Sequence, residues 1–205
     1  EPYGWVGRLA DAMAPSAPAN FLVNIGATQS LAVRARKHVP VVFDRPENFT
    51  REMFYEEGEV LKSPPEMHKT SNASQAFLLD IARSANDSSA LVRKAWSDYR
   101  SPVDYGINDL GLRRVAAMIA AGLPARLYYT AYANNAFDTH VVQNEQHPRL
   151  LTYTSDAVSA FLQDIERLGR AEDVTLMVFS EFGRRVPENT SLGTDHGAAN
   201  VMFVA

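Results

Sequence analysis

The sequence contains no cysteine among its 205 residues, which excludes disulfide bonds, thiolate metal sites and cysteine nucleophiles. It also lacks an apolar run of about 18 residues, the length typical of a membrane-spanning helix, so we expect no membrane span. Basic residues are not in excess, and the formal net charge of −4 argues against a nucleic-acid partner. The chain starts without Met and stops inside an apolar run, so we interpret it as a piece cut at both ends.

The rest of the composition is typical of a globular protein, with 46% hydrophobic and 21% charged residues. We expect a single domain over 1–205, because this length is sufficient for one hydrophobic core. Compact apolar runs predict strands at 21–26, 39–43, 125–131, 174–179 and 200–204. Helices are predicted in the first part of 5–19, at 51–57, at 110–121 and at 150–168. One or two helices are predicted in 71–100, with 86–89 as the expected break.

The order of these elements predicts an α/β fold. The uninterrupted apolar run at 174–179 is typical of a strand buried on both faces of a parallel sheet. We therefore expect 125–131, 174–179 and 200–204 to be neighbouring strands of one mostly parallel sheet. The amphipathic helix at 150–168 is expected to pack on a face of that sheet.

Three short blocks near the C-terminal end carry ligand chemistry: FDTH at 137–140, SEFGRR at 180–185 and GTDHG at 193–197. Each block follows or precedes a predicted strand, and ligands of open α/β sheets bind at the carboxyl ends of the strands. We predict that the carboxylates and imidazoles of these blocks converge on a divalent metal ion. The predicted ligands are Asp138, His140, Glu181, Asp195 and His196. Imidazole with carboxylate suits zinc, manganese or iron, and carboxylate with water also suits magnesium or calcium.

Each block alone has a simpler interpretation. A histidine beside an aspartate is usually a hydrogen-bonded surface pair. Glu181 can be a cap-type acceptor, Asp195 a turn residue and Arg184 plain surface charge. His147 precedes Pro148 at a predicted helix start, where a capping or solvent-facing role is expected. The glycines at 183, 193 and 197 are expected to allow tight turns beside an ion.

FDTHVVQ, the helix that ends in LG, and VTLMVFSEFGRRVPENTSLGTDHGAANVMFVA closely resemble a bacterial family, domain of unknown function family 1501. GWVGRL at 4–9 resembles a further segment of the family. Its members are often labelled sulfatase-like and are similar to the alkaline phosphatase superfamily. The resemblance implies an alkaline-phosphatase-like layered fold, with a mostly parallel central sheet flanked by helices and incomplete at both ends. It also implies a two-metal site for phosphate or sulfate ester chemistry, and an exported or periplasmic protein.

The chain departs from the superfamily pattern in two places. The superfamily carries its first metal-binding Asp and its nucleophile in an N-terminal segment that has no equivalent before Gly4. The strand at 174–179 is followed by Ser-Glu-Phe instead of an Asp-His pair. By the resemblance, Glu181 replaces that Asp, and His196 is the late metal-binding His. If Asp195 and His196 match the Asp-His pair instead, the ligands stay nearly the same and their metal assignments change.

The first functional hypothesis is a metal-dependent hydrolase of small anionic phosphate or sulfate esters, with zinc, manganese, calcium or magnesium as its ion. Arg184 is the predicted substrate-binding residue, because its planar fork matches a tetrahedral oxyanion. The nucleophile is not identified: Thr139 and Ser180 carry hydroxyls beside the ligands, and either can be a hydrogen-bonding support.

Two alternatives stay open. A non-catalytic, metal-stabilised module of a larger assembly would keep the fold and the ions without an identifiable nucleophile. A metal-free carbohydrate-binding domain is suggested only by Tyr128, Tyr129 and Tyr132, of which Tyr128 and Tyr132 read more simply as strand and loop packing. An Asp and a Ser or Thr after an N-terminal strand of the full-length gene product would favour the enzyme.

Overall fold

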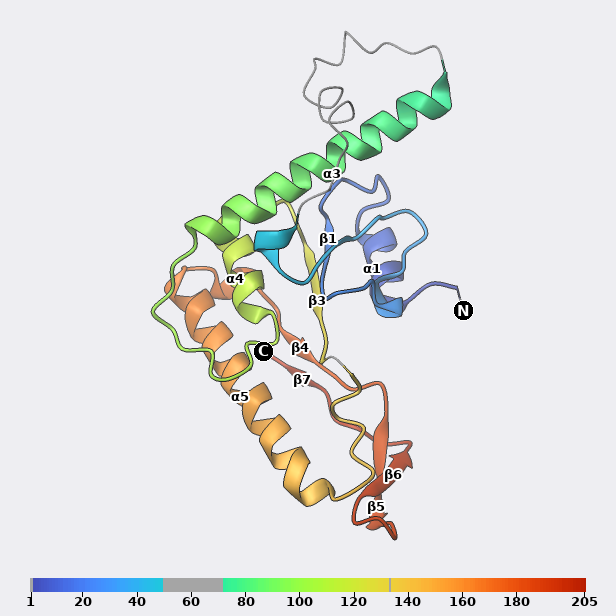
Figure 1. The fold of residues 1–205 in the computed structure, drawn as a ribbon, viewed down its shortest axis with the longest axis vertical. Coiled ribbons are helices and arrows are strands. Elements are labelled where there is room, and N and C mark those ends of the chain that lie inside the picture. Colours follow the sequence, from blue (N-terminus) through green and yellow to red (C-terminus); the bar gives the residue numbers. More distant parts are fainter. Residues whose placement is uncertain (1, 50–71, 133) are drawn as a thin grey trace. The chain divides into compact units, whose positions relative to one another are not determined.

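The computed structural model describes residues 2–49, 72–132 and 134–205 (Figure 1), so the helix predicted at 51–57 lies outside the described residues. The described part mixes α-helices with short β-strands, which confirms the α/β class. The chain divides into two compact units. Unit 1 comprises 1–100 and 117–129, and unit 2 comprises 101–116 and 130–205. The single domain over 1–205 stays a prediction, since two compact units can belong to one domain.

A three-stranded parallel sheet in the order β2-β1-β3 lies mainly in unit 1. Its strands are β1 (Leu22–Ile25), β2 (Val41–Phe43) and β3 (Leu127–Thr130). All residues of the central strand β1 are buried, as a strand covered on both faces requires. Helix α1 (Trp5–Met13) buries Val6 and Ala10 in a core shared with Phe21 and Leu22. The strands predicted at 21–26, 39–43 and 125–131 are confirmed in shorter form.

Helix α3 (Ala73–Asp98) is one continuous helix, so the break predicted at 86–89 is wrong. The side chain of Asn72 caps its start by accepting from two backbone N–H groups. Ser88 and Ser89 are buried, and the Ser89 hydroxyl donates to the carbonyl oxygen of Phe49 at 2.6 Å. These small polar residues are packed inside the protein and do not end the helix. Helix α4 (Leu112–Ala120) is confirmed, and Gly122 follows it with φ of +67°.

Helix α5 (Gln143–Arg167) is the long helix of unit 2 and confirms the prediction at 150–168. It begins earlier than predicted, so Pro148 lies inside it. Its inward face buries Ala157, Phe161 and Ile165. Among the described residues, short 3-10 helices lie at Leu31–Val33 (η1), Pro46–Asn48 (η2) and Ala171–Asp173 (η4). Neither α5 nor any other described helix combines the length and apolarity needed to cross a bilayer.

The C-terminal strands form two antiparallel pairs. Strand β4 (Met177–Val178) pairs with β7 (Phe203–Val204), and β5 (Gly183–Glu188) pairs with β6 (Thr194–Gly197). The prediction of one mostly parallel sheet containing 125–131, 174–179 and 200–204 is therefore wrong: β3 pairs in the β2-β1-β3 sheet, and β4 pairs with β7. The side chains are also less buried than predicted, since Met177 is 41% and Phe203 65% exposed. An apolar run predicts a strand but does not specify its partner or direction.

Candidate metal site

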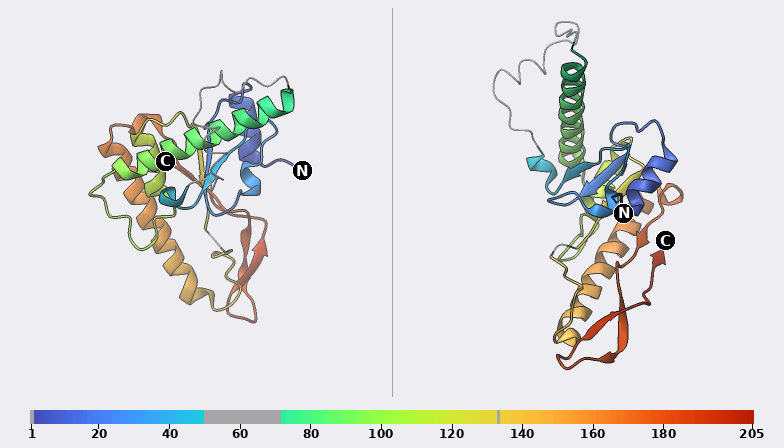
Figure 2. Two further views of the ribbon diagram at one scale, coloured as in Figure 1. Left: turned by 45° about the horizontal axis from the view of Figure 1, so that its top comes forward. Right: turned by 90° about the vertical axis from the view of Figure 1, so that its right-hand side faces the viewer.

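Two segments of unit 2 carry the candidate site. One is the ligand loop (137–142), which leads into α5, and the other is the β5–β6 hairpin (183–197). The start of α5 and the hairpin lie at the same end of unit 2 in each view (Figure 1 and Figure 2). Asn134 and Asn135 precede the loop with φ of 58° and 51°, a left-handed conformation that Asn tolerates better than most residues. Residues 194–197 of the GTDHG block form strand β6.

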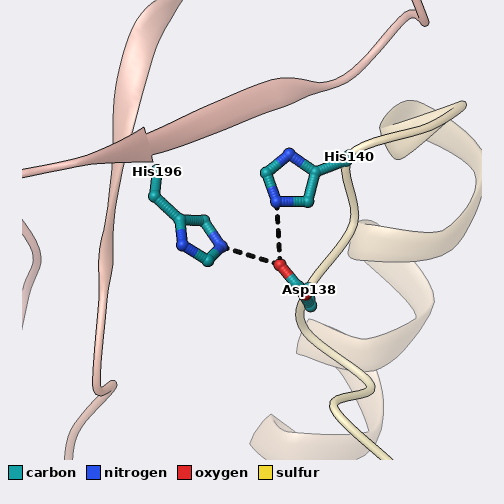
Figure 3. Close-up of side chains that lie close together, drawn as sticks. All are labelled: Asp138, His140 and His196. Atoms are coloured by element: carbon teal, nitrogen blue, oxygen red, sulfur yellow. Dashed lines mark hydrogen bonds and ion pairs between the residues drawn. The ribbon is translucent and has the colours of Figure 1, made fainter.

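Asp138, His140 and His196 converge between these two segments (Figure 3). Oδ1 of Asp138 lies 2.7 Å from Nε2 of His196 and 2.9 Å from Nε2 of His140. The rings of His140 and His196 are neighbours, with centroids 4.7 Å apart. The three side chains are 35%, 38% and 45% exposed respectively, so solvent reaches the cluster.

Asp138 is held as a carboxylate by its surroundings. The hydrogen bond from His196 lowers the pKa of Asp138 below its usual 3.8, against a smaller opposing effect of burial. Electrostatic interactions with His140, His196 and Arg184 lower that pKa further. An ionised carboxylate between two imidazoles is a donor set that a divalent transition metal can use.

The geometry fits such an ion with little movement. The three candidate ligand atoms lie within 4.8 Å of one another. A tetrahedral zinc ion with bonds of about 2.0–2.2 Å keeps its ligand atoms about 3.3 Å apart. The contacts of 2.7 and 2.9 Å are only slightly shorter, so small side-chain rotations would open a place for an ion. The exposure of the cluster leaves room for water or a substrate as a further ligand.

Asp195 lies beside this triad and not within it. Its Oδ1 is 3.6 Å from Nδ1 of His140, the nitrogen on the other side of the ring from Asp138. Asn189 Nδ2 donates to Asp195 Oδ1 at 3.1 Å and to the His140 carbonyl oxygen at 3.2 Å, and the first of these bonds lowers the pKa of Asp195. A carboxylate near the non-ligating nitrogen orients a metal-binding histidine. Asp195 therefore occupies the position of an orienting group for His140.

Glu181 and Arg184 also stand apart from the triad. Glu181 is exposed, and within the described residues it makes no hydrogen bond or ion pair with the triad. Nη2 of Arg184 is 4.0 Å from Asp138 Oδ1 and donates to the carbonyl oxygen of Phe137 at 2.7 Å. Nη1 of Arg184 donates to the carbonyl oxygen of Thr194. The guanidinium of Arg184 therefore contacts the protein backbone on both sides of the site.

His147 contributes to the site in a way that the sequence did not predict. It is half-buried in α5, and its Nδ1 lies 3.0 Å from the hydroxyl of Thr139, so the expected solvent-facing role at a helix start does not hold. Its ring meets Phe137 edge-on, with centroids 5.3 Å apart. Burial lowers the pKa of His147, and the charge of Arg184 adds to this effect, so both favour the neutral ring. Gln143 and His147 are four residues apart, the spacing that places two side chains on one helix face.

Phe182 supports His196 from the other side. The two rings stack with centroids 3.9 Å apart and an angle of 14° between their planes. The guanidinium carbon of Arg184 lies 5.1 Å from the centroid of the same phenyl ring. The ring of Phe182 therefore restricts the orientation of His196 beside Asp138.

The glycines of the three blocks allow neighbouring backbone segments to approach closely, whereas the sequence predicted that they would form tight turns. None of the glycines at 183, 193 and 197 has a positive φ. A Cβ added at Gly193 would lie 2.2 Å from the carbonyl oxygen of His140, which no side chain can tolerate. The absence of a side chain at Gly193 thus lets the hairpin contact the ligand loop.

The backbone at Val142 is strained. Its φ of 46° and ψ of 47° are left-handed, which is rare for a β-branched residue. The conformation is held by the hairpin: Val142 N–H donates to the Ser191 carbonyl oxygen at 3.0 Å, and Gln143 N–H donates to that of Leu192 at 2.9 Å. Strain of this kind persists where surrounding contacts fix the backbone, and it is common at functional sites.

Comparison with known proteins gives one family. Residues 4–205 match the family described as "Protein of unknown function (DUF1501)", which covers almost the whole chain. No curated protein and no solved structure matches the chain significantly.

Proposed function

The chain belongs to the DUF1501 family, and we propose that it is a metal-dependent hydrolase of phosphate or sulfate esters. The observation that carries this proposal is the convergence of Asp138, His140 and His196. Asp138 and His196 are 58 positions apart in the chain, yet their side chains meet at 2.7 Å. A cluster of two imidazoles and one carboxylate is the ligand set of many hydrolytic zinc sites.

The donor set favours a transition metal. Imidazole nitrogen suits zinc, manganese and iron, whereas magnesium and calcium prefer oxygen ligands. We propose zinc as the first ion to test and manganese as the second. A divalent ion held by these residues supplies Lewis-acid activation of an ester oxygen. The residues themselves supply the negative charge that binds the ion, the orientation of both imidazoles and, through Asp195, a partner for Nδ1 of His140.

The wider family resemblance supports the ester as substrate class. The alkaline-phosphatase-like layering, the sulfatase-like character, a second metal ion and the export of the protein belong to the same proposal, and they rest on the resemblance of FDTH, SEFGRR and GTDHG to the family motifs. Glu181 is proposed as a further ligand of that fuller site, whereas Asp195, predicted as a ligand, is proposed instead as the group that orients His140. The triad remains the part of the proposal that geometry supports.

A specific observation favours the second candidate, a metal-stabilised module without catalysis. The two hydroxyls considered as nucleophiles, those of Thr139 and Ser180, are both hydrogen-bonded. Thr139 is only 4% exposed, accepts from Gln143 at 3.0 Å and contacts His147 at the same distance. The Ser180 hydroxyl donates to the carbonyl oxygen of Phe182 at 2.7 Å. Because Thr139 is buried and the Ser180 hydroxyl hydrogen points to a backbone oxygen, neither hydroxyl is presented to a substrate.

The deciding experiment combines metal and activity. The protein is stripped with a chelator, reloaded separately with zinc, manganese, magnesium or calcium, and assayed on p-nitrophenyl phosphate, bis-p-nitrophenyl phosphate and p-nitrophenyl sulfate. We expect hydrolysis that returns with zinc or manganese and is lost in Asp138→Ala. Asp173→Ala is the matched control, since that carboxylate pairs with Arg170 on the surface. Metal binding without hydrolysis of any ester would establish the module, and no metal binding would overturn both candidates.

A further inference from the structure

We propose that Arg184 and Gln143 form a clamp that holds the ligand loop and the β5–β6 hairpin at metal-binding distance. In this account Arg184 is a positioning residue and not the group that binds the substrate. The inference rests on the proposed metal site at Asp138, His140 and His196, and it explains how ligands from two distant segments stay together.

Arg184 provides the first half of the clamp. Nη2 donates to the carbonyl oxygen of Phe137, the residue before Asp138, and Nη1 donates to the carbonyl oxygen of Thr194, two residues before His196. The guanidinium therefore spans both ligand-bearing segments. Its side chain is only 18% exposed, and its Nε is buried without a hydrogen-bond partner among the described residues.

This placement argues against the expected contact with a substrate. Bidentate recognition of a phosphate or sulfate needs two parallel N–H groups that face the ligand. One N–H of Nη1 and one of Nη2 donate to backbone oxygens, Nη2 also lies 3.5 Å from the Thr139 hydroxyl, and the buried Nε does not face solvent. Bidentate binding of a substrate through these bonded N–H groups would require the bonds to Phe137 and Thr194 to break.

Gln143 provides the second half. Its Nε2 donates to the hydroxyl of Thr139 at 3.0 Å, and its Oε1 accepts from the hydroxyl of Thr194 at 3.1 Å. Thr139 lies between the ligands Asp138 and His140, so the amide of Gln143 joins the ligand loop to strand β6. Thr194 is thus held twice, through its carbonyl by Arg184 and through its hydroxyl by Gln143.

The clamp acts by ordering the ligands before the ion arrives. An ion that binds ligands already in place does not have to immobilise two separate segments, and pre-organisation of this kind strengthens binding. Residues that orient metal ligands typically change metal affinity by about 10–100-fold when they are replaced. Lysine cannot substitute for Arg184, because an ammonium group on a flexible stem lacks the planar fork that reaches two carbonyl oxygens.

The test compares Arg184→Lys, Arg184→Gln and Gln143→Ala with Arg185→Gln, which removes the exposed neighbouring arginine on β5. Zinc affinity is measured by competition with a chromogenic chelator, and the visible spectrum of the Co²⁺-loaded protein reports the ligand geometry. Thermal unfolding in the presence of a chelator reports the stability of the metal-free chain. We expect the clamp variants to bind zinc about 10–100-fold more weakly and to change the Co²⁺ spectrum, with Arg185→Gln unchanged.

Several outcomes would overturn the clamp. One is wild-type zinc affinity and an unchanged Co²⁺ spectrum in both Arg184→Lys and Gln143→Ala. If, in addition, the KM for an ester rises in Arg184→Lys alone, Arg184 binds the substrate. Another is an equal loss of affinity in Arg185→Gln, which indicates a general effect of charge. If Arg184→Gln does not fold, Arg184→Lys and Gln143→Ala decide the question. A wild-type protein that binds no zinc refutes the metal site itself, a result distinct from the failure of the clamp alone.

Discussion

Nε2 of His196 lies 2.7 Å from Oδ1 of Asp138, and Nε2 of His140 lies 2.9 Å from the same oxygen. At these distances each imidazole donates a hydrogen to the carboxylate. A metal ion needs the lone pair of the same nitrogen, so metal binding moves the hydrogen of each neutral ring from Nε2 to Nδ1. A hydrogen and the ion therefore exclude each other at Nε2 of each ring.

The first prediction compares two histidines. His196→Ala removes a metal ligand and should abolish most metal binding, whereas His147→Ala removes only a partner of Thr139 and should weaken it by about 10–100-fold. Asp173→Ala is the control and should leave metal binding unchanged, because that carboxylate pairs with Arg170 at the surface. Metal content after dialysis gives the ranking. Equal metal content in His196→Ala and His147→Ala would exclude His196 as a ligand.

The second prediction concerns pH. The pKa of His147 in the folded chain lies below its ordinary 6.5, through burial first and the charge of Arg184 second. Below about pH 6.5 the unfolded chain therefore takes up a proton that the folded chain resists, and stability decreases as the pH falls toward the lowered pKa. Above that range the contribution is fully present. Denaturant unfolding at pH 7.5 and pH 5.5 should show that His147→Gln loses less stability between the two pH values than the wild type. Equal losses of stability would refute the role of His147 in the pH dependence.

The third prediction compares alanine substitutions at two glycines. Gly193→Ala places a Cβ 2.2 Å from the His140 carbonyl oxygen, so the hairpin must move away from the ligand loop and zinc affinity should fall at least about tenfold. Gly122→Ala is the control: its φ is +67° but its Cβ would meet open space, so it should cost about 1 kcal/mol of stability and no zinc affinity. Zinc titration with thermal unfolding separates the two effects. Intact zinc binding in Gly193→Ala would show that the close approach is unnecessary.

The fourth prediction concerns the buried carboxylate of unit 2. Asp164 in α5 has no exposed surface and accepts hydrogen bonds from Ser101 and Tyr105, each at 2.9 Å, and from Arg167 at 2.8 Å. Asp164→Ala should destabilise the fold by about 3 kcal/mol, since it leaves these donors without their acceptor.

The control for that prediction is Asp173→Ala, which breaks a surface ion pair with Arg170 and should cost less than about 1 kcal/mol. Urea unfolding monitored by circular dichroism measures both variants. Equal stabilities would show that the Asp164 network does not stabilise unit 2.

Local pattern in the sequence was sufficient for several elements. The buried strand β1 and the apolar stripe of α5 are visible because their periodicity directly reflects burial. The pairing partner of a strand cannot be predicted from its own residues. The apolar run that contains Met177 and Val178 predicts a strand with either a parallel or an antiparallel neighbour, and in the structure it pairs antiparallel with β7. The length of α3 was also missed, because Ser88 and Ser89 resemble a helix end unless their burial is known.

The candidate site was likewise predictable in part from the sequence. The residue types of Asp138, His140 and His196 predicted their meeting, since carboxylates and imidazoles at the ends of apolar segments favour a metal site. The environment of Arg184 could not be predicted, because its partner carbonyl at Phe137 lies 47 positions away. His147 was assigned to solvent because the predicted helix started too late to place it beside Thr139.

The most direct test of the account is a zinc titration of the metal-stripped wild-type protein and Asp138→Ala, with Asp173→Ala as control. The account predicts saturable zinc binding by the wild type and by Asp173→Ala, and affinity more than about 100-fold weaker in Asp138→Ala, because the one oxygen that contacts both imidazoles is removed. Equal zinc affinity in the wild type and Asp138→Ala would contradict it.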